Sequence, residues 1–176
     1  MEEKKVAKVI SLLVSVIVLI LSLQTIDDWE TVGAYVGCGL NCRISYPFYH
    51  ANLVHAILNG WCLLSVVFIY DISLWRLVLS YIVAVTIPTL CLSDIPTVGL
   101  SGVVYFLFGT ISFEVQRKLY YQLWMLFYIF LGFIFPNTNA LVHLYCYLVG
   151  VCFSLLNKPI KIGGNGDDYT KHYRGK

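Results

Sequence analysis

Long runs of apolar residues, separated by short polar segments, dominate the chain. Each run approaches the ~20 residues that a helix needs to cross the hydrocarbon core of a bilayer. The pattern therefore predicts an all-α membrane protein, a bundle of six transmembrane helices. The runs are roughly Val6–Ile26, Asn52–Tyr70, Leu74–Leu92, Gly99–Val115, Leu119–Phe135 and Asn139–Leu156.

The composition agrees with a membrane location and with a single domain. The chain has 176 residues, of which 59% are hydrophobic and only 12% charged, far from the values of ordinary globular domains. Lysines precede the first apolar run, but this run is long for a signal peptide and no convincing cleavage site follows it, so we expect a retained helix. We predict a membrane domain over residues 1–157 and a polar cytoplasmic tail over residues 158–176.

The distribution of basic residues predicts the orientation. If the N-terminus is cytoplasmic and the spans alternate, eleven of the twelve lysines and arginines lie inside and only Arg43 lies outside. This asymmetry follows the positive-inside rule. It predicts a multi-pass protein of the cell inner membrane with both termini cytoplasmic. The basic residues then serve as topology anchors, and the net charge of +2 does not indicate nucleic-acid binding.

Polar side chains gather at one end of three alternate runs. The second, fourth and sixth runs start on the same side, which brings together His50, His55, Asn59, Ser101 and His143. Taken singly, a serine or asparagine in such a helix is most often a packing or hydrogen-bonding residue. Together at one depth, a hydroxyl and an imidazole are typical of an activated nucleophile and its base.

At these residues the chain resembles the rhomboid family of intramembrane serine proteases. The segment Gly99–Tyr105, GLSGVVY, is similar to the family's GxSG motif with its following tyrosine. The segment His55–Asn59 resembles the HxxxN motif, with His50 at the position of an additional upstream histidine. His143 and Gly150 resemble the AHxxGxxxG pattern of the sixth helix. The resemblance covers the whole six-run core.

The resemblance implies a role for each of these residues. It makes Ser101 the nucleophile and His143 the general base, with no cofactor and no metal. It further implies oxyanion binding by His55, Asn59 and the Ser101 backbone N–H, loop shaping by Gly99, stacking on the His143 ring by Tyr105, and lining of a water-admitting polar cavity by His50. The implied partners are the lipid bilayer and single-pass transmembrane proteins, which would be cut in or next to their transmembrane segments.

Two positions depart from the family pattern. Val142 replaces the alanine before the histidine, and Cys146 replaces the first glycine after it. Larger side chains there could push the sixth helix from the fourth. We nevertheless expect the Ser101 and His143 side chains within hydrogen-bonding reach, about 2.6–3.5 Å apart.

Other protease chemistries fit the sequence less well. No HExxH zinc motif is present, and Asp71 and Asp167 lie at a run edge and in the tail, where they could not form a membrane dyad. A GxSxG elbow fails because position 103 is valine. No buried acid or internal repeat supports a transporter.

Three questions stay open at this point. One alternative function is a rhomboid-like pseudoprotease that binds membrane helices without cutting them; such proteins usually lack one dyad residue, whereas this chain has both. The oligomeric state is not determined by the sequence. Cys38 and Cys42 are four residues apart in the predicted outside loop, a spacing that permits a disulfide without requiring one.

Overall fold

The computed structural model describes residues 2–135 and 138–156, and this part of the chain is helical with no strand. A short helix α2 (Leu40–Ser45) and two 3-10 turns, Trp29–Thr31 and Thr89–Cys91, lie in connections. The prediction of an all-helical chain is confirmed for these residues. Six helices lie within or overlap the apolar runs: α1 (Glu2–Leu21), α3 (Leu53–Ile69), α4 (Leu74–Val85), α5 (Ser101–Thr110), α6 (Lys118–Ile134) and α7 (Ala140–Leu156).

The membrane part of the prediction is wrong. Within residues 2–135 and 138–156, no helix combines the length and the apolar character needed to cross a membrane. Helices α3, α6 and α7 have 17 residues each, which at ~1.5 Å per residue gives about 26 Å against a hydrocarbon core of about 30 Å. The predictions of a six-span transmembrane bundle and of a multi-pass inner-membrane protein with cytoplasmic termini are therefore wrong.

The apolar runs predicted helices that are longer than those observed, because apolar residues continue past the helix ends. Helix α4 has 12 residues and stops at Val85, ahead of Pro88, although apolar residues continue to Leu92. Helix α5 has only 10 residues. Helix α1 has 20 residues but carries acidic and basic side chains over its first two turns. The predicted tail over residues 158–176 lies outside the described residues.

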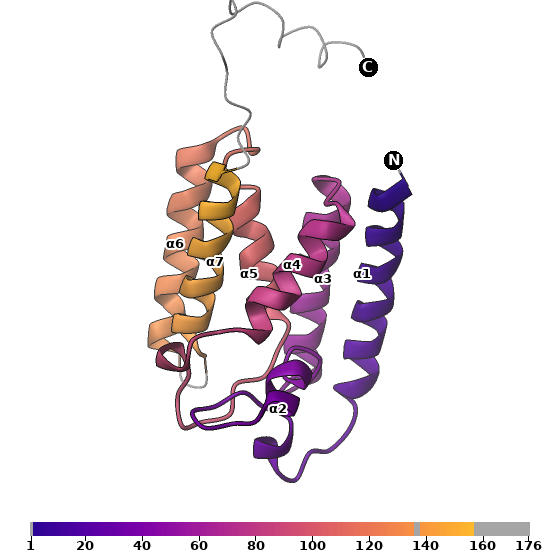
Figure 1. The fold of residues 1–176 in the computed structure, drawn as a ribbon, viewed down its shortest axis with the longest axis vertical. Helices are drawn as coiled ribbons and strands as arrows, with labels where there is room; N and C mark the ends of the chain where they lie inside the picture. The colour runs from indigo at the N-terminus through magenta and orange to yellow at the C-terminus, as the bar shows by residue number, and fades with distance from the viewer. Residues whose placement is uncertain (1, 136–137, 157–176) are drawn as a thin grey trace, which may run out of the picture.

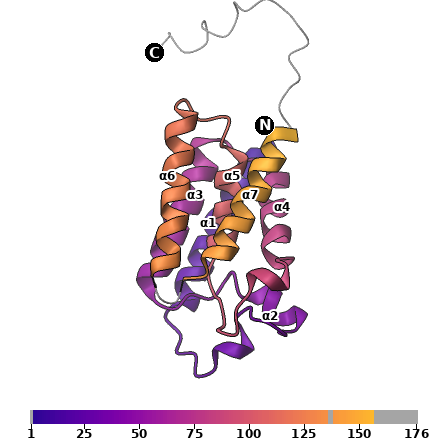
Figure 2. The same cartoon turned by 90° about the vertical axis from the view of Figure 1, so that its left-hand side faces the viewer.

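Helix α5 lies inside the bundle, between α7 on one side and α4 and α3 on the other, as both views show (Figures 1 and 2). Helices α1 and α6 form the two outer edges in Figure 1. Helices α3, α5 and α7 all begin at the same end of the bundle, where α2 and the long α1–α3 connection also lie (Figure 1). The predicted common direction of these three helices is thus observed.

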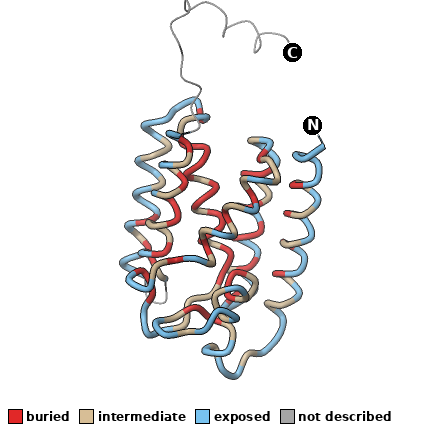
Figure 3. Tube along the Cα trace, viewed as in Figure 1, coloured by how far each residue is buried: buried red, intermediate tan, exposed pale blue. Residues whose placement is uncertain are grey.

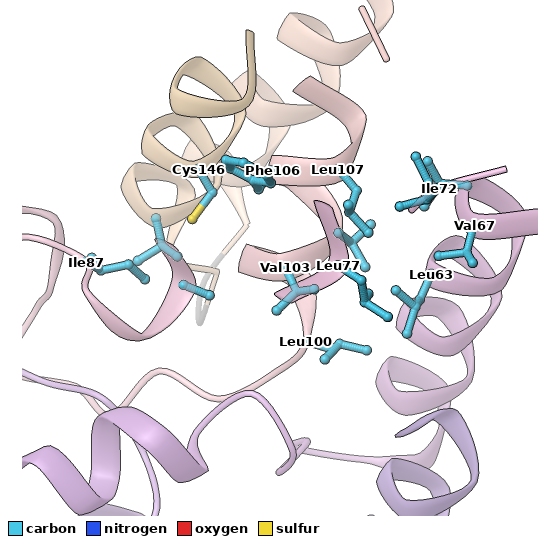
Figure 4. Close-up of a cluster of buried hydrophobic side chains, with 14 of the residues drawn as sticks. Leu63, Val67, Ile72, Leu77, Ile87, Leu100, Val103, Phe106, Leu107 and Cys146 are labelled. Carbon is cyan, nitrogen blue, oxygen red and sulfur yellow. The ribbon is translucent and has the colours of Figure 1, made fainter. Parts of the chain in front are cut away.

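Burial is concentrated around α5. Red segments in Figure 3 follow α5 and the inner faces of its neighbours, whereas the outer helices are mainly exposed. Leu63, Leu77, Leu100 and Val103 are buried and face one another from α3, α4 and the start of α5 (Figure 4). Burying such side chains contributes about 1.5–3 kcal/mol each, which fixes the start of α5 in the core.

The α1–α3 connection contains the two cysteines whose pairing the sequence left open. Cys38 and Cys42 are both free thiols in the structure. The Cys42 Sγ lies 3.3 Å from the Glu30 carbonyl oxygen and 3.4 Å from that of Thr31, and donates to them. The thiol of Cys42 therefore ties α2 to the preceding 3-10 turn.

Candidate active site

The structure brings Ser101 and His143 into direct contact. Ser101 is the first residue of α5 and His143 lies in the first turn of α7. The His143 Nε2 and Ser101 Oγ atoms are 2.8 Å apart, inside the range that proton transfer requires. When the imidazole is neutral with its proton on Nδ1, Nε2 accepts the hydroxyl proton of Ser101.

Glycines on the facing helices permit this close approach. A Cβ added to Gly109 of α5 would lie 2.3 Å from the Tyr147 carbonyl oxygen, and one added to Gly150 of α7 would lie 2.2 Å from the Phe106 carbonyl oxygen. No side chain fits at either distance, so the two backbones touch. This contact lies about two turns from the dyad on each helix and sets the separation of the helices at Ser101 and His143.

The departures from the family pattern are accommodated. Val142 is fully buried. Cys146 is also fully buried, and its Sγ would lie 3.5 Å from a Cβ placed on Gly102, an ordinary van der Waals separation. The sulfur therefore packs beside Gly102 in ordinary contact and does not wedge α7 away from α5. The Ser101–His143 distance accordingly falls within the expected range.

The ring of Tyr105 stacks on the imidazole of His143, as the resemblance implied. Their centroids are 4.4 Å apart and the ring planes differ by 18°. Burial, and secondarily the neighbouring His55, lower the pKa of His143 to about 4. The base is therefore neutral at physiological pH and able to accept a proton.

The loop before Ser101 has a conformation that requires glycine. Gly99 has φ +125°, and a Cβ there would lie 2.9 Å from Cε1 and 3.1 Å from Nε2 of His55. The Gly99 N–H donates to the Tyr46 carbonyl oxygen at 3.0 Å. The phenol of Tyr46 in turn donates to the Ala84 carbonyl oxygen at 2.9 Å. Tyr46 thus anchors the loop to α4, a role that the sequence did not reveal.

His50 has a different place from the one implied. It is buried, and its Nε2 accepts a hydrogen bond from the Leu100 N–H at 3.1 Å. Its ring packs edge-on against that of His55, with centroids 4.8 Å apart. Burial, and secondarily the neighbouring His55, lower the pKa of His50 to about 4. A neutral His50 fixes the residue just before the nucleophile, and it is not among the residues that line the pocket described below.

His55 and Asn59 lie on one face of α3, but only His55 reaches the pocket. Burial lowers the pKa of His55 below its ordinary value, which favours a neutral ring with one N–H donor. Asn59 is buried and its Nδ2 donates to the His55 carbonyl oxygen at 3.0 Å. In this conformation Asn59 holds the backbone of His55 and retains a second amide hydrogen.

Ser101 also contributes its backbone to the site. Because Ser101 begins α5, its N–H has no partner within the helix, and the side chain of the N-cap residue Leu100 makes no capping hydrogen bond. The partial positive charge of a helix N-terminus favours a developing negative charge here. Together with His55, the Ser101 N–H can therefore bind an oxyanion formed on a carbonyl attacked by the Ser101 Oγ.

A pocket of about 620 Å³ opens over the dyad. It is lined partly by the segment that precedes Gly99, which an isolated antiparallel bridge between Ala34 and Thr97 keeps extended. The residues lining it are Trp29, Ala51, Asn52, His55, Ser93, Ile95, Pro96, Thr97, Val98, Ser101, Thr138, Asn139 and His143. The pocket thus gives access to both Ser101 and His143.

Sequence reasoning missed two asparagines that position the histidines. The Asn52 Oδ1 accepts from the His55 N–H at 2.9 Å, and the Asn139 Oδ1 accepts from the Val142 N–H at 3.2 Å. The Asn139 Nδ2 also donates to the Thr97 Oγ1 at 3.0 Å, which connects α7 to the loop before Ser101. The signal was present, because an asparagine at the start of an apolar run is typical of a helix N-cap.

Among residues 2–135 and 138–156, no group of three or more histidine, cysteine, aspartate or glutamate side chains is arranged to hold a metal ion. In comparisons with known proteins, no family model, curated protein or solved structure matches the chain.

Proposed function

We propose that the protein is a serine endopeptidase that works with a Ser101–His143 dyad through an acyl-enzyme. The observation that carries the proposal is the 2.8 Å contact between the Ser101 Oγ and the His143 Nε2 at the base of an open pocket. A packing serine has no need of a neutral, stacked imidazole at this distance. The motif resemblance to the rhomboid proteases supports the same assignment.

The geometry supports the steps of a serine-protease reaction. His143 takes the Ser101 hydroxyl proton on Nε2 while Oγ attacks the scissile carbonyl carbon. The tetrahedral oxyanion is bound by the Ser101 N–H and the His55 ring, and Asn59 assists by holding His55 in place or by offering its second amide hydrogen. His143 then gives its proton to the leaving amine, and a water molecule activated by the same base hydrolyses the acyl-enzyme.

The resemblance supports a substrate class as well as a reaction. It implies peptide bonds in or next to the transmembrane segments of single-pass proteins. The substrate must present an extended stretch, because a helical backbone uses its carbonyls in internal hydrogen bonds. The pocket is lined along the loop before Gly99 by Pro96, Thr97 and Val98, and Thr97 already pairs in an antiparallel bridge with Ala34, which is compatible with such a stretch.

A labelling experiment combined with peptide cleavage tests the proposal. A fluorophosphonate should label the wild type on Ser101, and Ser101→Ala and His143→Ala should each reduce cleavage of a fluorogenic single-span substrate by about 10⁴-fold or more. The control is Ser112→Ala, which removes a hydroxyl from the α5–α6 turn and should leave labelling unchanged. Undiminished cleavage by Ser101→Ala would refute the assignment. Absence of both labelling and cleavage in the wild type would favour a non-cleaving binder.

A further inference from the structure

A second cavity lies at the opposite end of the bundle from the dyad, where α6 begins (Figure 1). It has a volume of about 490 Å³, and Val115 and Arg117 are among its lining residues. Most of the lining is aromatic, and the aromatic residues come from the end of α3 and from α6: Tyr70, Tyr120, Tyr121, Trp124 and Tyr128. None of these residues takes part in the proposed protease site.

The aromatic residues of α6 form a continuous wall. The rings of Tyr120 and Trp124 are 6.0 Å apart and nearly perpendicular, and those of Trp124 and Tyr128 are 5.6 Å apart. Tyr121 is fixed by its hydroxyl, which donates to the Phe108 carbonyl oxygen at 2.9 Å. The wall is accessible, since Tyr120 is 59% and Trp124 40% exposed. Faces of tyrosine and tryptophan rings attract cations, and cages of such rings recognise quaternary ammonium groups.

The rim of the same cavity is positively charged. Arg117 is exposed and directly precedes α6, and it belongs to neither of the ion pairs formed by the described residues. No side chain caps the N-terminus of α6, so its first N–H groups and the helix dipole add to the attraction for an anion. An arginine guanidinium binds phosphate through paired hydrogen bonds.

We propose that this cavity binds a phosphocholine group, with the trimethylammonium against Trp124 and its neighbouring rings and the phosphate on Arg117. A ligand with only one of the two charges would leave half of the cavity unused: a simple cation would be repelled by Arg117, and a simple anion would gain nothing from the rings. A cation carried next to a phosphate matches both. The two available sources are a soluble phosphocholine compound and the headgroup of a lipid.

Calorimetric titration of the full chain with soluble phosphocholine tests this binding. We expect saturable binding with Kd below about 10 mM. Trp124→Leu should weaken it roughly 5- to 30-fold by removing the best cation-binding ring. Arg117→Gln should weaken phosphocholine by a similar factor but leave choline affinity unchanged or improved. Phe130→Leu, an exposed aromatic change on α6 outside the cavity, and Lys118→Gln, a charge removed beside it, are the matched controls and should retain affinity within about twofold.

Binding to lipid vesicles distinguishes a soluble phosphocholine compound from a lipid headgroup as the ligand. Binding of the protein to phosphocholine-lipid vesicles is compared with its binding to phosphoglycerol-lipid vesicles that have the same acyl chains. If the ligand is a lipid headgroup, the wild type should be retained on the phosphocholine vesicles, and Trp124→Leu should reduce that retention. Retention on both vesicles alike, with no response to soluble phosphocholine, would overturn the proposal. So would equal binding of inorganic phosphate, or an unchanged affinity in Trp124→Leu. Ser101→Ala should bind as the wild type does, so this test is independent of the protease assignment.

Discussion

Helices α5 and α6 are both rich in apolar residues, yet the fold treats them very differently. Seven of the ten residues of α5 are buried, whereas in α6 only Ile129 and Gly132 of seventeen are. Large apolar side chains such as Leu123 and Phe130 are exposed on α6. Apolar composition therefore does not decide which helix becomes the core; the pattern of small residues that lets neighbours approach does.

The two helices also differ in what they carry. Helix α5 touches α7 through Gly109 and Gly150 and starts with the nucleophile. Helix α6 instead presents an aromatic wall to the surface. Precise chemistry needs the rigid, close-packed element, because rate depends on sub-ångström placement of the reacting atoms. A binding surface can be formed by a less buried helix such as α6.

The largest expected effect comes from breaking the α5–α7 contact. Gly150→Val places a side chain into the Phe106 carbonyl, 2.2 Å from the Cβ position. We expect a loss of about 3 kcal/mol or more of unfolding free energy and no detectable activity. Denaturant titration followed by circular dichroism measures the stability.

Two control variants show whether the loss of stability in Gly150→Val is specific to the α5–α7 contact. Gly60→Ala on α3 meets Ser15 at 3.5 Å and should change stability by less than about 1 kcal/mol, in the stabilising direction. Phe130→Ala on α6 removes an exposed side chain and should change it by less than about 0.5 kcal/mol. A large loss in Phe130→Ala would contradict the contrast between the two helices.

A second prediction separates a clash at the active site from backbone strain. Gly99→Ala combines φ +125° with a 2.9 Å approach to His55, whereas Gly37→Ala has φ +87° with nothing within 4 Å. Both should lose about 1–2 kcal/mol of stability, but only Gly99→Ala should lose activity, by roughly 100-fold, because it displaces an oxyanion donor. Equal kcat/KM values for the two variants would remove His55 from the proposed mechanism.

A larger side chain at position 146 should change the Ser101–His143 distance, with a smaller effect on activity than Gly99→Ala. Cys146→Leu adds atoms beside Gly102, where the sulfur already lies 3.5 Å from the Cβ position. We expect roughly a tenfold loss of kcat/KM and 1–3 kcal/mol of destabilisation from overpacking. Cys146→Gly, which restores the family pattern, should keep activity. If Cys146→Leu were as active as the wild type, helix separation at this level would not control the dyad.

The smallest effect is expected from pH. Because the pKa of His143 is lowered to about 4, its neutral form dominates down to pH 5. The value of kcat/KM should therefore fall less than about twofold between pH 7 and 5, against roughly 25-fold for a base with pKa 6.5. Half-maximal activity near pH 6.5 would show a solvated His143.

The same titration has a stability counterpart. His50 and His143 hold fewer protons in the folded than in the unfolded chain between pH about 4 and 6.5. Their contribution to stability is therefore complete above pH 6.5 and is lost as the pH falls through that window. Melting temperatures measured in parallel with the rates keep unfolding apart from the protonation of the base.

Local pattern predicted a large part of the site. The apolar runs located six of the helices, and the common direction of α3, α5 and α7 placed Ser101, His143 and His55 at one end. The pattern failed on helix length, because apolar residues such as Leu92 and Val115 continue beyond the last helical turn. The pattern also did not reveal the hydrogen bond by which the Leu100 N–H donates to His50.

The sequence by itself determined which six segments form the main helices and that Ser101, His143 and His55 lie near helix ends on one side of the bundle. Those features depend on the order of residue types along the chain, which local propensity and periodicity express. Only the tertiary structure decided the 2.8 Å dyad distance, the bond from Leu100 to His50, and the position of the aromatic wall. These depend on the packing of side chains that are distant in sequence, such as Gly109 against Gly150, and packing is a property of the whole bundle.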